Sequence, residues 1–117
     1  MSNDNQILLP SLQEGETEPY SLVGRARAKP EMADQLQTRL IDMVAPTRKE
    51  PGALEYHVHR DRHDNNLFVF YEVWQSREHL ERHLTTPHVQ DFLKERHHYL
   101  EGDMEIDWLV MQSPYPE

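Results

Sequence analysis

Four stretches of the chain alternate between hydrophobic and polar positions, which is the pattern of a β-strand with one buried face. The stretches are residues 20–28, 53–60, 67–74 and 103–111. Residues 67–74, Leu-Phe-Val-Phe-Tyr-Glu-Val-Trp, depart from this pattern because they are apolar on both faces. A polar segment at 61–66 separates the second and third stretches and predicts a hairpin loop.

Between the strands, hydrophobic residues recur every three or four positions, as in an amphipathic helix. The first such helix follows Pro30 and carries Met32, Leu36, Leu40, Met43 and Val44 on one face. Pro46 removes one helix hydrogen bond, so we expect the helix to kink or change axis there. Gly52 then supplies the positive φ of a turn. After the third strand, Ser76 is the predicted N-cap of a short helix, and Pro87 is the predicted first residue of another.

The order of elements, β-α-β-β-α-α-β, predicts a ferredoxin-like α+β fold, in which helices cover one face of an antiparallel sheet. The other face of such a sheet is bare. Because residues 67–74 are apolar on both faces, the bare face needs a cover, and a second copy of the sheet is the simplest one. We therefore expect a homodimer of a domain at residues 20–111. Residues 1–19 are expected to form an acidic, flexible arm, and residues 112–117 a C-terminal tail.

Composition narrows the classes of function. The chain has 117 residues, no cysteine and a formal net charge of −9. This length predicts one domain, and the absence of cysteine excludes thiolate sites and fits a reducing cytoplasm, where we expect the protein to reside. The acidic balance argues against nucleic acid as a partner. A membrane is not an expected partner either, because no apolar run approaches the roughly 18 residues of a span and the first residues show no signal-peptide pattern.

The segment His-Leu-Thr-Thr-Pro-His at 83–88 carries the first candidate chemistry. Proline favours extended backbone in the residue before it, as an N-cap requires, so Thr86 is the predicted cap. His88 then lies beside the positive end of the new helix, where a neutral imidazole is favoured. His83 lies at the negative end of the preceding helix, where the imidazolium is favoured. The pair suits proton transfer. The alternative is an ordinary helix cap with two bystander histidines.

Glu72 is the second candidate, because it shares a strand face with aromatic residues of the apolar stretch 67–74. A carboxylate among such neighbours needs a partner. One possibility is a salt bridge to Arg25 or Arg27 on the first strand, or across a dimer. The other is a pocket in which the carboxylate orients a histidine or a substrate hydroxyl.

His57 and His59 form an H-x-H pair on one face of the second strand. Such a pair holds Zn, Fe or Cu when a third ligand joins it, and His63, Glu55 or Glu72 could supply that ligand. The spacing is not diagnostic, so no metal site is expected. The chain contains no glycine-rich phosphate loop and no Gly-x-Ser-x-Gly motif. We therefore expect no nucleotide, flavin or other cofactor.

Three segments together resemble the antibiotic biosynthesis monooxygenase (ABM) family, in particular its small bacterial members that are similar to quinol monooxygenases. They are VAPTRKEPGALEYHVHRD at 44–61, FVFYEVWQSREHLERHLTTPHVQDF at 68–92 and the closing strand. The resemblance covers residues 20–111. Its most specific part is the Tyr-Glu-x-Trp strand end at 71–74 followed by the histidine-containing junction at 83–88.

The resemblance implies a dimeric α/β barrel with a pocket in each subunit, and oxidation of electron-rich phenols or quinols without metal or flavin. The catalytic residues that it implies are His83, His88 and Glu72. The substrate-binding residues that it implies are Trp74, Phe92, Tyr56 and Tyr71.

From these observations we expect a cofactor-independent monooxygenase, an oxidoreductase that uses O2 to convert a small phenol or quinol to a quinone. Its expected partners are the small aromatic substrate, O2 and a second copy of the chain. Two alternatives stay open: an acid–base isomerase of a small (phospho)metabolite, and a non-catalytic dimeric module that holds an apolar ligand. A metal-dependent reaction is a further alternative.

Overall fold

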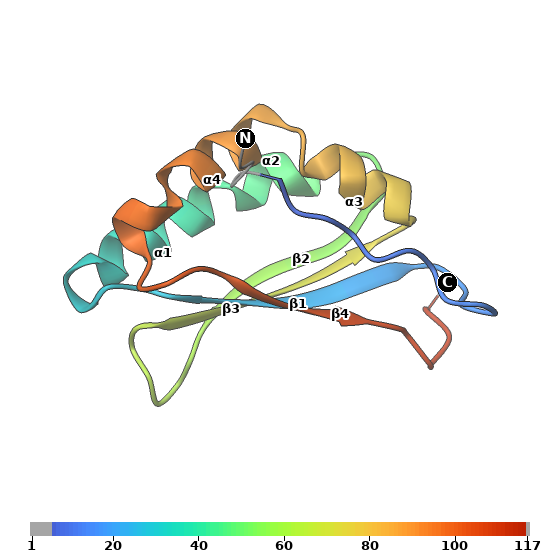
Figure 1. The fold of residues 1–117 in the computed structure, drawn as a ribbon, viewed down its shortest axis with the longest axis horizontal. Helices are drawn as coiled ribbons and strands as arrows, with labels where there is room; N and C mark the ends of the chain where they lie inside the picture. Colours follow the sequence, from blue (N-terminus) through green and yellow to red (C-terminus); the bar gives the residue numbers. More distant parts are fainter. Residues whose placement is uncertain (1–5, 117) are drawn as a thin grey trace.

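A four-stranded antiparallel sheet lies under a single layer of helices in the computed structural model, which describes residues 6–116 (Figure 1). The sheet order is β2-β3-β1-β4. The strands are β1 (Tyr20–Arg27), β2 (Ala53–Arg60), β3 (Leu67–Trp74) and β4 (Glu105–Leu109). The helices are η1 (Pro30–Met32), α1 (Ala33–Asp42), α2 (Val44–Arg48), α3 (Arg77–His83) and α4 (Pro87–Tyr99). The predicted α+β ferredoxin-like fold is confirmed. Within the described residues, no helix combines the length and the apolar character needed to cross a lipid bilayer.

The predicted elements match the observed ones closely, and the differences have local causes. The first helix breaks at Met43, between α1 and α2, whereas the sequence places the kink at Pro46. The break precedes Pro46 because a proline ring clashes with the carbonyl four residues earlier. Here that carbonyl belongs to Asp42, the last residue of α1. The last strand begins at Glu105, two residues later than predicted, after a turn at Gly102 with φ of 75°.

The face of the sheet under the helices, called here the covered face, holds the core. Phe68, Phe70, Glu72 and Trp74 of β3 point into it, as the alternation predicts. Gly24 on β1 pairs with Phe70, and a Cβ at this glycine would lie 2.1 Å from two carbons of the Phe70 ring. Glycine at this position therefore lets the Phe70 ring approach β1 closely.

One residue that the sequence places on the covered face, Leu54, does not lie there. The alternation in the second strand groups Leu54 with Tyr56 and Val58, but Leu54 is 41% exposed. The pairing of β2 with β3 shifts register between Ala53 and Glu55, as in a β-bulge. A bulge adds one residue on one strand and so breaks the alternation of side chains at that point.

The opposite face of the sheet, called here the open face, has no helix over it (Figure 1). One row across this face runs from Leu109 through Ser21 and Val73 to Glu55. The Tyr115 hydroxyl donates to Glu55 Oε2 at 3.1 Å, so the C-terminal tail reaches from the β4 edge to the β2 edge along this row. This path explains why Ser21 and Val73 are 2% and 0% exposed although they belong to the open face.

The segment before β1 runs from the helical layer past α3 to the sheet (Figure 1). The Tyr20 hydroxyl donates to the carbonyl of Pro10 at 2.7 Å, and Arg77 at the start of α3 binds backbone carbonyls of the same segment. Residues 6–19 therefore have defined contacts with the domain. The predicted flexibility of the arm concerns its motion and stays a prediction, and its first five residues lie outside the described part of the chain.

Candidate active site

A cavity of about 50 Å³ lies between the covered face of the sheet and the helices. Its walls are almost entirely apolar. Among the described residues that line it, the ionisable side chains are Tyr56, Glu72 and His83. They come from β2, β3 and the end of α3, so three separate elements bring them to one wall.

The junction between α3 and α4 fixes the positions of His83 and His88. His83 is the last residue of α3 and is 3% exposed, whereas His88 is the second residue of α4 and is only partly buried. Thr86 has the extended backbone of an N-cap, as predicted, but its side chain accepts no hydrogen bond from α4. Its hydroxyl instead donates to the carbonyl of His83 at 2.7 Å and so ties the two helices together.

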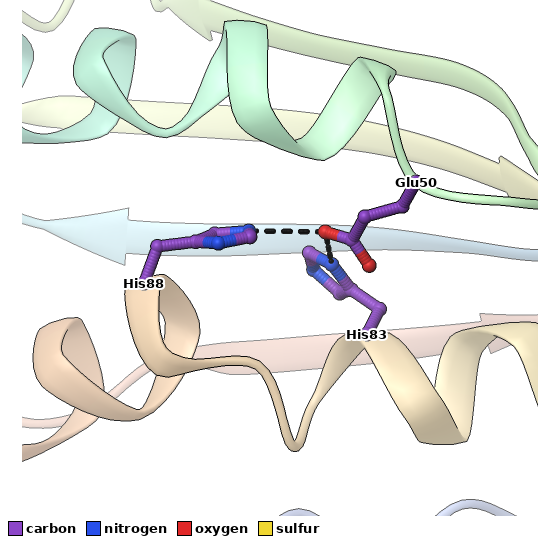
Figure 2. A group of neighbouring side chains, drawn as sticks. All are labelled: Glu50, His83 and His88. Carbon is purple, nitrogen blue, oxygen red and sulfur yellow. Dashed lines mark hydrogen bonds and ion pairs between the residues drawn. The ribbon is translucent and has the colours of Figure 1, made fainter.

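Glu50 joins the two histidines (Figure 2). Its Oε2 lies 2.8 Å from Nδ1 of His83 and 3.0 Å from Nε2 of His88. Because an ionised carboxylate only accepts hydrogen bonds, both imidazoles donate to it. With its Nδ1 protonated, His83 in its neutral form has its other nitrogen, Nε2, free to accept a proton.

Glu50 is a site residue that the sequence does not predict. It lies between α2 and the turn at Gly52, where φ is 82°. A Cβ at Gly52 would lie 2.3 Å from the ring of His79 on α3, so the glycine lets this turn approach α3 closely. That tertiary contact brings Glu50 to the histidines. Its local sequence, in a charged Arg-Lys-Glu run, carries no signal of burial.

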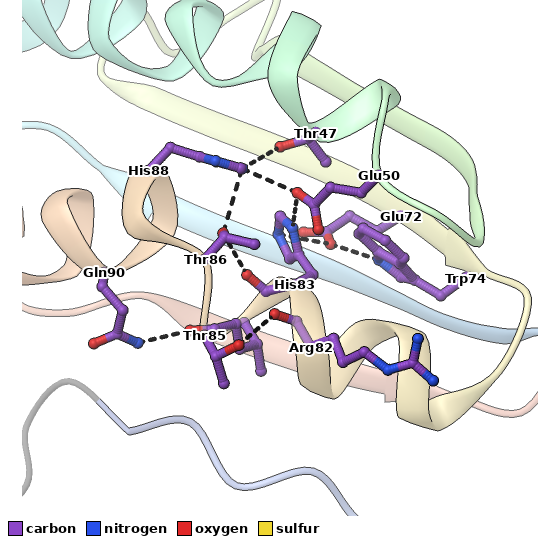
Figure 3. Close-up of polar contacts among 11 residues, drawn as sticks. Thr47, Glu50, Glu72, Trp74, Arg82, His83, Thr85, Thr86, His88 and Gln90 are labelled. Carbon is purple, nitrogen blue, oxygen red and sulfur yellow. Dashed lines mark hydrogen bonds and ion pairs between the residues drawn. The ribbon is translucent and has the colours of Figure 1, made fainter.

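Glu72 lies on the other side of His83 (Figure 3). Its Oε1 accepts a hydrogen bond of 2.9 Å from Nε1 of Trp74 and lies 4.0 Å from Nε2 of His83. Burial raises the pKa of Glu72, whereas the nearby His83 and the Trp74 hydrogen bond oppose that rise. The alternative partners Arg25 and Arg27 lie on the open face, where each pairs with an aspartate. The structure thus favours the pocket interpretation of Glu72 over the salt bridge.

Tyr56 completes the polar wall. It is 5% exposed, and its ring meets that of His83 edge-on, with 5.8 Å between ring centroids. Burial raises the pKa of its hydroxyl far above the ordinary value, and the charges of Glu72 and Glu50 add to this rise. The hydroxyl therefore stays protonated at neutral pH and can act as a hydrogen-bond donor, but not as a base.

The structure places the other predicted residues at different distances from the cavity. Phe92 lines it. Trp74 lies behind the wall, with its ring 4.6 Å from that of His83. His88 also lies behind the wall and is linked to His83 through Glu50. The buried Thr47 hydroxyl lies 3.2 Å from Nε2 of His88. Tyr71 precedes Glu72 in β3, so its side chain points to the open face. The structure therefore does not bring it to the cavity.

One group of side chains in the described part of the chain could hold a metal ion. Ligand atoms of Glu50, His83 and His88 all lie within 4.8 Å of one another. Two imidazoles and a carboxylate suit a divalent transition metal. The hydrogen bonds from both histidines to Glu50 account for the same arrangement without an ion. The predicted H-x-H pair is different, because His57 pairs with Glu55 on the open face and its ring centroid is 6.4 Å from that of His59.

Glu72→Gln tests the electrostatics of this wall. Because the pKa of Glu72 is raised in the folded state, the ionised carboxylate is less favourable there than in the unfolded chain. Glutamine keeps the acceptor for Trp74 and removes the charge. At a pH above the folded pKa, we expect the variant to melt about 4 °C higher for each 1 kcal/mol by which the ionised carboxylate destabilises the fold. The difference should shrink to zero as pH falls below the ordinary value of 4.5, where both states are protonated.

Melting temperatures from pH 4 to 9 measure this difference, with Glu105→Gln on the exposed edge strand as the control. A variant that melts lower than the parent at neutral pH but equally at pH 4 would show that the Glu72 charge stabilises the fold, as a partner of His83.

Known proteins resemble this chain in both sequence and structure. The family model "Antibiotic biosynthesis monooxygenase" matches residues 19–95. The protein sll1783 of Synechocystis sp. is 31% identical over 100 residues, which are 83% of this chain and 68% of that protein.

Solved structures superpose over most of the chain. The structure of PA3566 from Pseudomonas aeruginosa has a TM-score of 0.78 and 36% identity, covering 84% of this chain and 98% of its own. The structure of Rv0793 from Mycobacterium tuberculosis has a TM-score of 0.75 and 25% identity, covering 86% and 98%. The family model spans well over half of the chain, including β1 to β3 and both histidines of the site. The chain belongs to the antibiotic biosynthesis monooxygenase family.

Proposed function

We propose that this protein is a cofactor-independent monooxygenase of the quinol-monooxygenase-like type, which oxidises a small electron-rich phenol or quinol to a quinone with O2. One observation carries the proposal. His83 is held at Nδ1 by Glu50, and its other nitrogen faces Glu72 at the wall of an apolar cavity. A carboxylate that orients an imidazole in this way creates a general base with a defined tautomer.

In the proposed reaction, Nε2 of His83 accepts the phenolic proton. The resulting imidazolium lies between Glu50 and Glu72, whose negative charges stabilise it. The phenolate then passes one electron to O2, and the phenoxyl radical and superoxide combine to form a bond between a ring carbon and oxygen. His83 returns its proton to the peroxide. Loss of the hydrogen on that ring carbon breaks the O–O bond, so that one oxygen atom stays as a carbonyl and the other leaves as water.

The apolar cavity has two roles in this scheme. It excludes water, which strengthens the interaction of the imidazolium with the two carboxylates. It also gives O2, a small apolar molecule, a place beside the aromatic ring. Phe92 and Phe70 supply flat apolar surface for the ring, and the protonated Tyr56 can donate a hydrogen bond to a substrate oxygen. His88 does not touch the cavity in this arrangement, so we assign it a positioning role through Glu50.

The isomerase alternative gains no support from the cavity. A phosphorylated substrate requires a cationic or amide-rich phosphate site. None of the described residues that line the cavity is lysine or arginine. The two arginines considered for this role, Arg25 and Arg27, lie on the open face in ion pairs with Asp107 and Asp64.

Oxygen uptake with ¹⁸O2 tests the proposal. The purified protein is incubated with a panel of dihydroxyaromatics, and uptake is compared with the autoxidation of each compound alone. We expect enzyme-dependent uptake with one ¹⁸O atom in the quinone and the other in water. Hydrogen peroxide as the product, or uptake no faster than autoxidation with every compound, would contradict a monooxygenase.

Removal of metal ions tests whether the reaction is independent of cofactors. We expect dialysis against a chelator to change kcat by less than about twofold, because the proposed base and its orienting carboxylate need no ion. Metal content is measured before and after dialysis. A loss of activity that Fe²⁺ or Zn²⁺ restores would instead assign Glu50, His83 and His88 as metal ligands.

We further propose that the open face is the surface of a homodimer. Its centre is apolar and half-buried, with Val23, Val69 and Tyr71 side by side on β1 and β3. The ion pair of Arg25 and Asp107 lies at its margin. An apolar centre with a charged rim is the usual anatomy of an interface.

Tyr71→Asp tests this surface, because a charge at the centre of the interface would be buried without a partner. Light scattering should give twice the chain mass of 13.9 kDa for the parent and the chain mass for the variant. The control is His97→Asp, an exposed position on α4, which lies on the opposite side of the sheet. A parent protein that scatters as a monomer would overturn the dimer.

A further inference from the structure

The cavity wall contains a residue from outside the sheet and helices. Among the described lining residues, Ile7 alone comes from the segment before β1, and the others lie between Leu22 and Trp108. Residues 7–10, called here the strap, cross the helical layer next to α3. The side chain of Leu9 in the same strap packs against the core cluster around Trp74 and Leu80. The strap thus contributes one wall of the cavity.

Arg77 at the start of α3 holds the strap in place. Its Nη2 donates to the carbonyl of Leu9 at 2.7 Å, and its Nε donates to the carbonyl of Pro10 at 2.9 Å. The backbone N–H of the same residue donates to Glu18 Oε2 at 2.7 Å. One side chain therefore makes two charge-assisted hydrogen bonds to consecutive carbonyls, which fix the strap by its backbone.

Beneath this attachment the strap is not closely packed. A hollow of about 430 Å³ lies between residues 6–9 and the α3–α4 junction. Leu8 points outward and is 75% exposed. A segment with few packed side chains and partly exposed hydrogen bonds opens at low free energy compared with the core.

The volume of the cavity limits which molecules fit while the strap is in place. Its volume is about 50 Å³ with the strap in place. A protein cavity that binds benzene measures roughly 150 Å³. With the strap in place the cavity is therefore too small for an aromatic ring, and one of its walls must move before such a substrate can enter. The sheet and helix walls belong to the packed core, so the strap is the wall that can move.

We propose that the strap is a movable wall of the substrate cavity, that Ile7 sets the size of the substrate that fits, and that Arg77 is a positioning residue that holds the strap closed. The inference rests on the proposed function for the chemical class of the ligand, an aromatic diol. Substrate entry lifts residues 7–10 from Arg77, and their return closes the apolar cavity over the ring.

Binding without O2 tests the wall apart from the chemistry, because no turnover is possible. Equilibrium dialysis under argon gives Kd for benzene-1,4-diol and for naphthalene-1,4-diol, which carries a second ring. We expect Ile7→Ala to improve the binding of the larger diol relative to the smaller one by at least about tenfold, since it removes three carbons from the wall. Leu8→Ala, which shortens the exposed neighbour, should leave the ratio within twofold.

Stopped-flow binding tests the attachment. Arg77→Ala removes both hydrogen bonds to the strap, so we expect both diols to associate at least about fivefold faster than with the parent protein. Arg82→Ala on the same helix is the control and should leave the association rates unchanged. A merely structural role of Arg77 would lower the melting temperature without accelerating association.

The outcomes separate this inference from the proposed function. A changed binding ratio in Ile7→Ala supports the movable wall even if no diol is oxidised in air, a result that would overturn only the monooxygenase. If the parent oxidises the diols and Ile7→Ala has the same binding ratio as Leu8→Ala, the wall is overturned and the monooxygenase stands. Unchanged association rates in Arg77→Ala would also overturn the strap as a gate.

Discussion

Replacement of His83 by glutamine is expected to lower kcat for diol oxidation by about 100-fold or more, with a smaller change in KM. The reason is that His83 lies on the cavity wall and is oriented by a carboxylate. Glu50 makes this contact, at 2.8 Å from Nδ1 of His83. Loss of a general base costs roughly 10² to 10⁴ in rate. Glutamine can still donate a hydrogen bond to Glu50, so the fold is retained.

His97→Gln provides the control, because this histidine is exposed on α4 and remote from the cavity. Steady-state kinetics across pH and circular dichroism on all three proteins separate a loss of base from a loss of fold. If the glutamine variant keeps more than a third of the parent kcat, His83 is not the base, and Glu72 becomes the remaining candidate for the base on the wall.

Replacement of Glu50 by glutamine is expected to have an effect of similar size, about 100-fold in kcat, although Glu50 does not line the cavity. Both imidazoles donate to its Oε2. An amide has an NH2 group that donates as well as an oxygen that accepts, so it can donate to Nδ1 of His83 and leave the proton on the opposite ring nitrogen. The tautomer with a protonated Nε2 cannot accept a proton from the substrate. Glu50→Asp keeps the charge and should recover part of the activity.

The open face offers a matched control for this substitution. Glu55 pairs with His57 at 3.3 Å, which is also a carboxylate–imidazole contact but lies outside the cavity. Glu55→Gln should leave kcat within twofold of the parent. Equal activity of Glu50→Gln and Glu55→Gln would remove the orienting carboxylate from the mechanism and, with it, the positioning role of His88.

The fold could be predicted from the sequence because its signals are local. The ranges 53–60 and 67–74 coincide with β2 and β3, since alternation and a polar loop define both ends of each strand. Proline at position 87 marks the first residue of α4, and Ser76 caps α3 by accepting from the backbone N–H of His79. In each of these cases the side chain that carries the signal is also the one that makes the contact.

The candidate site could be predicted only in part, because several of its contacts join segments that are distant in the sequence. His83 and Glu72 were identified by their unusual surroundings, a helix junction and an apolar strand. Glu50 has unremarkable neighbours in sequence, and only the packing of its turn against α3 brings it to the histidines. The arm before β1 reads as polar and acidic, so the placement of Ile7 in the cavity wall also depends on tertiary packing.

The contact between Gly24 and Phe70 has a consequence for how cavities in such sequences change over time. Every glycine codon becomes an alanine codon through one base change. At position 24 that change would place a methyl carbon 2.1 Å from the Phe70 ring, so the ring would have to turn away from β1. The space that lies open to it is the cavity that Phe70 lines. One mutation can therefore fill the cavity while Tyr56, Glu72 and His83 stay in place, so a descendant can keep the whole polar wall and lose the space beside it.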